Sequence, residues 1–548
     1  MRLPRLNRSE QRSTAALLGP WILAFGLFLV YCADSVSRYY RAAPGSYDLG
    51  IFTEAVKQYA HFHAPIVDIL QPGFDLLGDH FHPIIAVLGP FFLLFPSPVT
   101  LLVGQAVLFA VAAVPIVWLG RERIGTGAAY AVGVTYGLSF GVAQAVDFDF
   151  HEIAFAVPLL AFALWAMFEE RYRTMVVCCF LLLLCKEDLG LTFVLPFGIA
   201  VILKGRVGLG AGISAMGTAG SLAAIYWIIP HFNPQHVYTY WSKNSCVGTT
   251  GGVAHGNAVS CLWDSATNTA GTKIELVFLL LSVTAFVALR SPYVLFIVPN
   301  LGLRFISTDS SFWGTAYHYN AVLMPVLCVV AIEAIERARR AAPLVLVAVD
   351  PVDPVSPPQS AAAESGVLAS SLLASEAPAA DTDTETDTDA DIDTPDEDAA
   401  DALPPARWRR WAHVTSEAMG RHGAVAMMAA VVAMLPQFAF GQFFSPSTFT
   451  FDARTSGLRD AVAAVPANVT VEGTINVLAP LAAKDDAFWI GNAGNPAVQY
   501  ILLDTVASGF SQNITDPVQF VEQRHPGATY TVVWSDTFGI YVLKKTSG

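Results

Sequence analysis

Long apolar runs separated by short polar segments extend along most of the chain. Eleven of these runs approach the ~20 residues that cross about 30 Å of hydrocarbon, where backbone must satisfy its own hydrogen bonds in a helix. The pattern therefore predicts an α-helical polytopic membrane protein with about 11 transmembrane helices. The predicted spans are residues 14–33, 98–119, 127–146, 153–168, 174–187, 189–203, 208–229, 274–290, 292–306, 320–335 and 423–442.

Four of these spans are short for a full crossing. Short helices of this kind usually surround a cavity or a thinned region of the bilayer, so we expect them to surround a cavity here. They are residues 153–168, 174–187, 189–203 and 292–306.

The Lys and Arg residues predict the orientation through the positive-inside rule. The rule makes residues 1–340 a transmembrane core with a cytoplasmic N-terminus, a first outer loop at 34–96 and a second outer loop at 230–272. The stretch HPIIAVLGPFFLLF, residues 82–95, is apolar but short, and it contains two prolines. It is interpreted as an interfacial or re-entrant piece, because a full crossing would invert the loops that follow.

The last third of the chain changes composition twice. Residues 341–405 are rich in Ala, Pro, Ser and Asp without an apolar period, which predicts a disordered acidic cytoplasmic linker. Residues 406–444 contain the last transmembrane helix, and 445–548 are predicted to form a small extracytoplasmic α/β domain. The domain shows one amphipathic helix pattern, SGLRDAVAAVP, and the strand-like runs NVTVEGTI, AVQYILLD, ATYTVVWSD and GIYVLKK.

Composition argues against a soluble globular protein. The chain is 54% hydrophobic and 14% charged, whereas soluble domains are about a quarter charged. Its net charge of −14 comes mostly from Glu376–Asp401, which carries twelve acidic groups and no basic ones. The acidity is therefore a property of the linker, and no nucleic-acid partner is expected.

Two of the seven cysteines lie in one polar loop. Cys246 and Cys261 both fall within 230–272, and a disulfide between them is expected if this loop is extracytoplasmic. The other five cysteines fall in or beside apolar runs and are interpreted as packing residues.

Nearly all the unusual polar residues fall on the predicted outer side. Ionisable groups among membrane spans are costly and usually line a cavity, so five clusters on one face predict a functional site there. The clusters are Asp48; Asp79, His80 and His82; Asp147, Asp149, His151 and Glu152; Lys186, Glu187 and Asp188; and Arg304 with Tyr317, His318 and Tyr319.

The clusters also have plain structural interpretations. Asp48 can cap an interfacial helix, and Lys186 can form an ion pair within its own cluster. Asp147 and His151 would be i and i+4 on a helix, either as a base with its orienting partner or as an ordinary helix end. Lys186 and Arg304 are the best candidates to hold an anion such as phosphate.

Two further patterns favour structure over binding. The aromatic run HVYTYW, His236–Trp241, is interpreted as an interfacial belt rather than a sugar platform. His80 and His82 would share a face only in an extended segment. No cluster has an unambiguous metal-ligand spacing, so no cofactor is required and a divalent metal stays an open alternative.

Several motifs in a fixed order resemble a known family. They are SYDLGIF, GDHFHP, DFHE, KED and YHYNAVLMP in the core and LRDAVAAVPANVTVEGTINVLAPLA in the tail. The chain resembles a prokaryotic multi-pass membrane protein family catalogued as a domain of unknown function, over most of its length except 341–405. One departure lies in the tail, where Ala479, Pro480 and Leu481 lack the histidine expected after the proline.

That family is similar in architecture to GT-C type glycosyltransferases. The resemblance implies a polyprenyl-phosphate-linked sugar donor, an extracytoplasmic glycan or protein acceptor, and a first-loop acid that Asp48 matches. Asp48 would be the general base, and Lys186, Arg304 and His318 would hold the phosphate. The implied catalytic group is Asp48, Asp149, His151 and Glu152, and the implied substrate-binding group is Asp79, His80, His82, Lys186, Glu187, Asp188, Arg304, Tyr317 and His318.

Two other classes of function stay open. A secondary transporter with a carboxylate and histidine relay would place ionisable groups at mid-membrane and repeat its halves, whereas these clusters lie at one end of the spans. A membrane receptor or scaffold whose tail binds a partner is the third class. The expected location is the cell (plasma) membrane, with the C-terminal domain extracytoplasmic.

Overall fold

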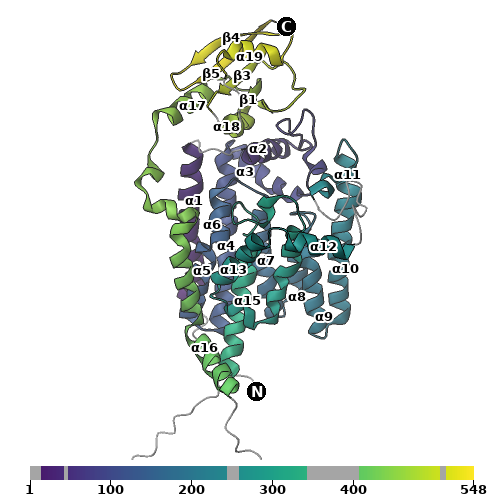
Figure 1. The fold of residues 1–548 in the computed structure, drawn as a ribbon, viewed down its shortest axis with the longest axis vertical. Helices are drawn as coiled ribbons and strands as arrows, with labels where there is room; N and C mark the ends of the chain where they lie inside the picture. The colour runs from purple at the N-terminus through teal and green to yellow at the C-terminus, as the bar shows by residue number, and fades with distance from the viewer. Residues whose placement is uncertain (1–13, 42–46, 244–257, 342–406, 507–513, 548) are drawn as a thin grey trace, which may run out of the picture.

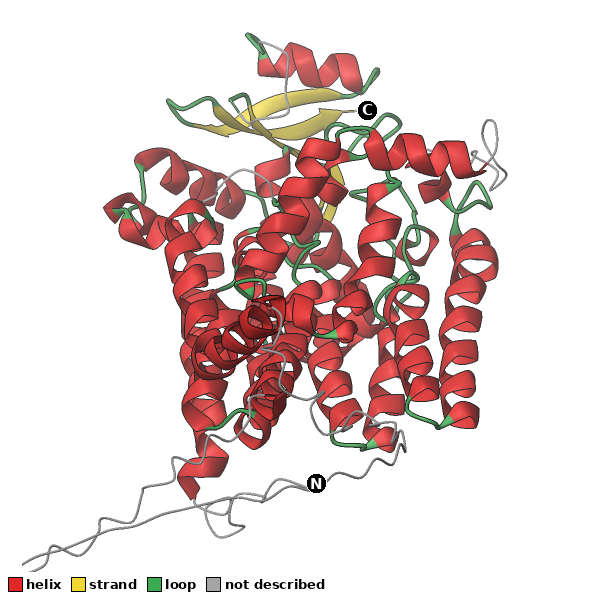
Figure 2. Cartoon of the chain, turned by 60° about the horizontal axis from the view of Figure 1, so that its bottom comes forward, coloured by secondary structure: helices red, strands yellow, loops and turns green. Residues whose placement is uncertain are grey.

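The computed structural model describes residues 14–41, 47–243, 258–341, 407–506 and 514–547. Helices build a tall bundle, and the strands gather in a separate region beyond one end of it (Figure 1; Figure 2). This architecture confirms the prediction of an α-helical polytopic membrane protein with a small C-terminal α/β domain. The linker predicted at 341–405 lies outside the described residues except for its first residue, which ends a helix.

The bundle is built from helices of very different length. Each of the eleven predicted spans coincides with one helix or with consecutive short helices. The helices are α1 (Thr14–Tyr40), α4 (Pro98–Arg123), α5 (Thr126–Leu138), α6 (Phe140–Asp147), α7 (Ile153–Phe168), α8 (Tyr172–Leu182), α9 (Leu195–Leu203), α10 (Val207–Ala223), α13 (Ala270–Val283), α14 (Val298–Phe305), α15 (Leu323–Ala341) and α16 (Arg407–Met434).

Only some of these helices are long and apolar enough to cross a membrane by themselves. Within the described part of the chain there are 5 such stretches, and four further predicted spans, 153–168, 174–187, 189–203 and 292–306, coincide with shorter apolar helices. The five are Leu17–Tyr40, Pro98–Arg123, Thr126–Asp147, Val207–Phe232 and Ser416–Gln437. The number of crossings is therefore approximate, because it depends on the shorter helices.

Glycine allows a close contact between two helices of the bundle. A Cβ atom built on Gly198 of α9 would lie 2.6 Å from the carbonyl oxygen of Gly210 on α10, closer than real side chains approach. Small residues bring helix backbones together where lipid supplies no hydrophobic driving force. A larger residue at either position would therefore separate α9 from α10.

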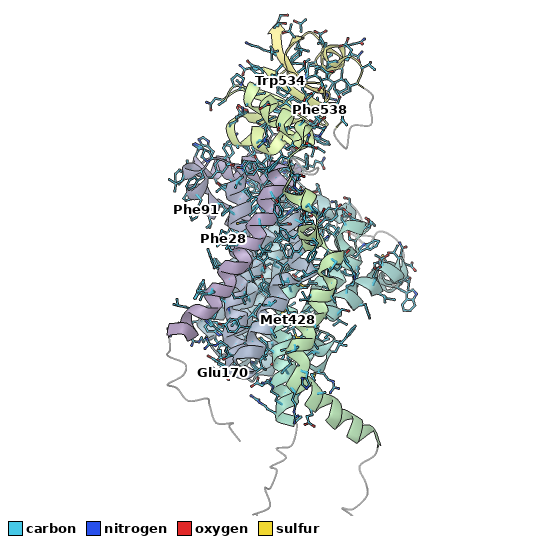
Figure 3. The ribbon with its side chains drawn as sticks, turned by 90° about the vertical axis from the view of Figure 1, so that its left-hand side faces the viewer. Phe28, Phe91, Glu170, Met428, Trp534 and Phe538 are labelled. Atoms are coloured by element: carbon cyan, nitrogen blue, oxygen red, sulfur yellow. The ribbon has the colours of Figure 1, made fainter. Side chains whose placement is uncertain are left out.

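Further short helices are α2 (Tyr47–Ala60), α3 (Gly89–Leu94), α11 (Ile229–Phe232) and α12 (Ala258–Thr267). The predicted interfacial stretch forms a 3₁₀ segment, Pro83–Leu88, followed by α3. Phe91 and Leu94 in α3 are exposed, and Phe91 points away from the bundle (Figure 3). Its location at the lipid interface stays a prediction.

The C-terminal domain contains a five-stranded sheet with the strand order β2-β1-β3-β5-β4. β1 pairs in parallel with β2 and β3, and β5 pairs antiparallel with β3 and β4. Four strands match the predicted runs, but β2 was not predicted because DAFW is only four residues and begins with an exposed Asp. The elements are α17 (Ala453–Ala464), β1 (Thr470–Gly473), α18 (Ile475–Lys484), β2 (Asp486–Trp489), β3 (Tyr500–Asp504), α19 (Pro517–Arg524), β4 (Thr529–Ser535) and β5 (Ile540–Ser547).

The core of the bundle continues into the C-terminal domain through α18. Leu49 of α2 and Leu478 of α18 belong to the same buried apolar cluster, which also includes Val471 of β1. A smaller separate cluster on the other side of the sheet includes Ile501 and Val521. The domain is thus packed onto the bundle at α2 (Figure 1), the helix that carries Asp48.

Only one of the two cysteines of the predicted disulfide is among the described residues. Cys261 is disulfide-bonded, and Cys246 lies outside the described residues. The predicted pairing therefore stays a prediction. The other five cysteines are free thiols, four of them buried, as expected for packing residues.

Candidate functional site

Two adjoining cavities collect all but one of the predicted site residues. Asp48, Asp79, His80, His82, His151, Glu152, Lys186, Tyr317 and His318 line the first cavity. The second cavity is lined by His80, Lys186, Glu187, Asp188, Arg304 and His318. Because His80, Lys186 and His318 face both, the two cavities form one continuous site, although its residues come from five separate parts of the sequence.

A carboxylate and two imidazoles form the centre of the first cavity. Asp48 lies in the first turn of α2, and its Oδ2 is 3.4 Å from Nε2 of His151. The Asp48 side chain is 37% exposed, whereas the His151 side chain is 7% exposed. The His151 ring stacks on His318 with 3.7 Å between ring centroids. An accessible carboxylate beside a fixed, buried imidazole is the arrangement of a base with its orienting partner.

The segment that carries His151 is not helical. α6 ends at Asp147, so the predicted i,i+4 helical pair of Asp147 and His151 is wrong. Arg38 of α1 holds the chain just after this helix end, because its guanidinium donates to the Phe148 carbonyl at 2.6 Å. Asp147 instead accepts from the Gln442 amide at 2.8 Å.

Gln105 of α4 holds the same segment from its other side. Its amide nitrogen donates to the Asp149 carbonyl at 3.3 Å, and its amide oxygen accepts from the His151 backbone N–H at 3.1 Å. Gln105 is buried, and the sequence analysis missed it. The available signal was a lone amide in the apolar run LLVGQAVLF, since a buried amide requires hydrogen-bond partners.

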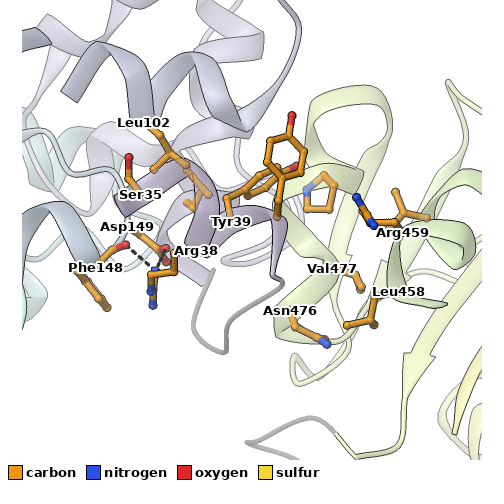
Figure 4. Close-up of a pocket in the computed structure, with 14 residues that line it drawn as sticks. Ser35, Arg38, Tyr39, Leu102, Phe148, Asp149, Leu458, Arg459, Asn476 and Val477 are labelled. Atoms are coloured by element: carbon orange, nitrogen blue, oxygen red, sulfur yellow. Dashed lines mark hydrogen bonds and ion pairs between the residues drawn. The ribbon is translucent and has the colours of Figure 1, made fainter. Parts of the chain in front are cut away.

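Asp149 is the predicted residue that does not line the site. Its carboxylate pairs with Arg38 at 3.2 Å. It lines a different cavity, between α1, α4 and the helices α17 and α18 of the C-terminal domain, where Arg38, Asn476 and Arg459 also lie (Figure 4). Asp149 is therefore placed to hold the His151 segment through Arg38 rather than to contact a substrate beside Asp48.

The lysine of the KED motif is paired outside its own cluster. Lys186 Nζ lies 2.8 Å from Glu152 Oε1, so the alternative of an ion pair within 186–188 is wrong. Glu187 binds His80 Nδ1 at 2.7 Å and also accepts from the Tyr238 hydroxyl at 3.0 Å. These contacts connect the start of α7 and the first loop to the turn that carries Lys186, Glu187 and Asp188.

His80 and His82 of the first loop have pKa shifts in opposite directions. Burial opposes the charged form of His80, but the Glu187 carboxylate outweighs burial and raises the pKa of His80 above its ordinary value. Burial lowers the pKa of His82 to about 4. Burial thus leaves His82 neutral at neutral pH, whereas Glu187 shifts the pKa of His80 in the opposite direction.

Arg304 braces the loop that carries His318. Its guanidinium donates to the carbonyls of Phe312 and Tyr319 and to Oδ1 of Asn320, the last two at 3.2 and 2.9 Å. An arginine has five donors, so two remain for the cavity that it lines. Tyr317 in this loop has a left-handed backbone, φ 64°. It turns the chain between Phe312 on one side and Tyr319 and Asn320 on the other.

The aromatic run 236–241 is part of the site. Tyr240 stacks on His80 with 4.2 Å between ring centroids, and its hydroxyl donates to Asp79 at 3.4 Å. Tyr238, Tyr240 and the neighbouring Lys243 line the second cavity. Tyr238 and Tyr240 thus face the cavity, whereas the interpretation of the run as an interfacial belt stays a prediction. The sequence signal for a binding role was Lys243, which follows Tyr238 and Tyr240 closely in a loop segment with few other charges.

The histidines and acids of the site were possible metal ligands by residue type. The rings of His80 and His82 are 6.3 Å apart, and His82 faces Phe52. The described residues contain no group of three or more His, Cys, Asp or Glu side chains arranged for a metal ion. His80 is held by Glu187, and the ring of His82 packs against Phe52.

Fold and site together define a polytopic membrane protein with a GT-C-like core and a charged cavity beneath a C-terminal α/β domain. The chain belongs to the DUF2079 family of predicted membrane proteins, whose model matches residues 38–349. This match confirms the resemblance seen in the motifs.

A solved structure with a similar fold is the crystal structure of ArnT from Cupriavidus metallidurans bound to undecaprenyl phosphate. It has a TM-score of 0.50 and 15% sequence identity, with 96% of this chain and 98% of the ArnT chain covered. At this identity the likeness shows the fold, and it confirms the predicted GT-C-like architecture. No curated protein sequence gives a significant match.

Proposed function

We propose that the protein is a GT-C type glycosyltransferase that moves a sugar from a polyprenyl-phosphate donor to an extracytoplasmic glycan or protein. The observation that carries the proposal is the 3.4 Å approach of Asp48 to His151 in a cavity that also contains Lys186. A base and a cation in one cavity are the two groups that glycosyl transfer to a hydroxyl requires. The undecaprenyl phosphate bound to ArnT supports the class of lipid.

In the proposed reaction the acceptor oxygen forms a bond to the anomeric carbon of the sugar while the carbon–oxygen bond to the phosphate breaks. Asp48 takes the proton of the acceptor hydroxyl. The polyprenyl phosphate leaves with the electron pair of the broken bond, and Lys186 stabilises its charge.

His151 is suited to assist Asp48 directly. Its Nδ1 lies 3.2 Å from the Asp149 carbonyl oxygen, and a carbonyl only accepts, so Nδ1 carries a proton. Nε2, which faces Asp48, is then free to bind the proton that Asp48 has taken. Asp48 and His151 thus form a short route for the proton away from the acceptor.

The proposal is tested with the purified full chain in proteoliposomes. Radiolabelled sugars on polyprenyl phosphate are supplied as a panel with an extract of envelope acceptors, and transfer of label is measured. We expect one donor to label an acceptor in a protein-dependent reaction. Absence of transfer from every donor, together with uptake of a solute into the liposomes, would replace the proposal with a transporter.

We also propose that the site and the C-terminal domain face outward. Glu170, near the arginines in the last turn of α4 and after α7, lies at the end of the bundle opposite Trp534 of the C-terminal domain (Figure 3). Positive charge favours the cytoplasmic side. We therefore expect reporter fusions after Arg123 and Arg340 to be cytoplasmic and fusions after Asp264 and Asp452 to be external. An external reporter after Arg123 would contradict this orientation.

A further inference from the structure

The C-terminal domain touches the helix that carries Asp48 at very short range. A Cβ atom built on Gly50 would lie 3.2 Å from Cβ of Leu478 and 3.4 Å from the backbone nitrogen of Ala479, both on α18. Only glycine at this position lets α2 and α18 meet without one of them yielding. The contact begins two residues after Asp48, so a shift of α18 changes the support of the first turn of α2.

Aromatic packing supports the start of α2 from the same domain. Trp489 at the end of β2 makes an edge-to-face contact with Tyr47, with 5.1 Å between ring centroids. Tyr47 is the first residue of α2 and the direct neighbour of Asp48. A ring in this position limits the directions in which the first turn can move.

Polar contacts hold the other end of α2 and the loop that follows it. Lys57 Nζ donates to the Asp485 carbonyl at 2.5 Å. The Asn492 amide donates to the carbonyls of Ile69 and Leu70 at 2.8 and 3.1 Å. The Ile69 N–H in turn donates to the buried carboxyl of Glu54 on α2. The domain therefore contacts α2 at both ends and also fixes the loop packed against it.

We propose that the C-terminal domain positions Asp48 and that Trp489 and Asn492 are positioning residues of the site. The inference rests on the proposed function for its catalytic consequence. α2 has 14 residues, and a helix of that length is marginal unless tertiary packing holds it. Displacement of a reacting group by about 1 Å costs on the order of 100-fold in rate, so a loosely held α2 would slow transfer without removing any reacting group.

The first test measures position without any assay of sugar transfer. Hydrogen–deuterium exchange is followed in detergent-purified full-length Trp489→Ala and Asn492→Ala proteins, with Val533→Ala on the exposed edge strand β4 as the matched control. We expect amides of α2 to exchange at least about tenfold faster in the first two variants and unchanged in the control. Unchanged protection of α2 in both variants would overturn the proposal.

The second test asks whether the domain acts through Asp48. Trp489→Ala and Asn492→Ala are each measured in the wild-type and Asp48→Asn backgrounds, per amount of folded protein. We expect each to lower kcat about tenfold or more in the wild type, with little change in donor KM, and to cause no further loss with Asp48→Asn. Equal losses in both backgrounds would show a general structural role. If the wild type transferred no sugar, the proposed function would fail, and the exchange experiment would still decide the positioning of α2.

Discussion

Asp48→Asn is expected to slow sugar transfer from the polyprenyl-phosphate donor at least about 100-fold, because a positioned base is worth on the order of 10²–10⁴ in rate. The substitution keeps the size of the side chain and removes the oxygen that takes the proton. Asp48 is more than one third exposed and contacts His151 at 3.4 Å. The protein should therefore fold and reach the membrane normally. Radiolabelled transfer in purified membranes, with expression checked by blot, gives the result.

Asp79→Asn is the matched control for this substitution. Asp79 lines the same cavity and accepts from the Tyr240 hydroxyl, and asparagine keeps an oxygen for that hydrogen bond. We expect it to change the maximal rate much less than Asp48→Asn. Undiminished transfer by Asp48→Asn, or equal losses in the two variants, would remove Asp48 as the base.

Lys186→Met is expected to raise the donor concentration that gives half-maximal rate by about 10- to 100-fold, because a hydrogen bond to a charged group contributes about 1.5–3 kcal/mol. The same substitution leaves the Glu152 carboxylate, whose side chain is 2% exposed, without its partner at 2.8 Å. Removing one member of a buried pair costs about 3–5 kcal/mol of stability. The variant should therefore also melt at lower temperature in detergent.

A second substitution separates these two effects of Lys186. Glu152→Gln combined with Lys186→Met removes both charges, so we expect it to recover much of the lost stability without recovering donor affinity. Lys243→Met is the control for a cation in the same cavity, since its side chain is exposed and its pair with Asp309 is 3.5 Å long. An exposed pair contributes about 0–1 kcal/mol. Normal donor affinity in the folded double variant would show that Lys186 serves the Glu152 pair alone.

The location of the charged groups bears on the rival function as well. A secondary transporter is expected to carry its ionisable groups near the bilayer midplane, between repeated halves. In this chain Asp48 lies on α2, the helix on which α18 of the C-terminal domain packs, at one end of the bundle (Figure 1). A carboxylate at this end of the bundle suits the proposed reaction with a large acceptor better than a relay through the bundle.

Much of the architecture was predictable from local pattern. Apolar runs must become helices in lipid, since each backbone group needs a partner within its own segment. This requirement acts on every span separately, and it explains why the predicted spans coincide with helices. The β-branched and aromatic runs of the tail likewise predicted four of its strands, whereas β2 is too short to show a period.

The membership of the site was also largely visible in the sequence. Ionisable residues in an apolar chain are expensive and need a wet or paired environment, so their positions marked the cavity before its shape was known. Gln105, Tyr238 and Tyr240 were not predicted as site residues, because burial of an amide or a hydroxyl costs less free energy than burial of a charge. Their importance depends on which groups they meet.

The sequence by itself determined the membrane class, the helices and most of the polar residues of the site, because lipid acts on each segment through its own composition. Only the tertiary structure decided which of these polar residues pair with each other and which helices pack together. Lys186 pairs with Glu152 rather than with its sequence neighbours, Asp149 pairs with Arg38, and α18 packs against Gly50 of α2. Such contacts join residues far apart in the chain, and their energies depend on distances and burial that exist only after the helices have packed.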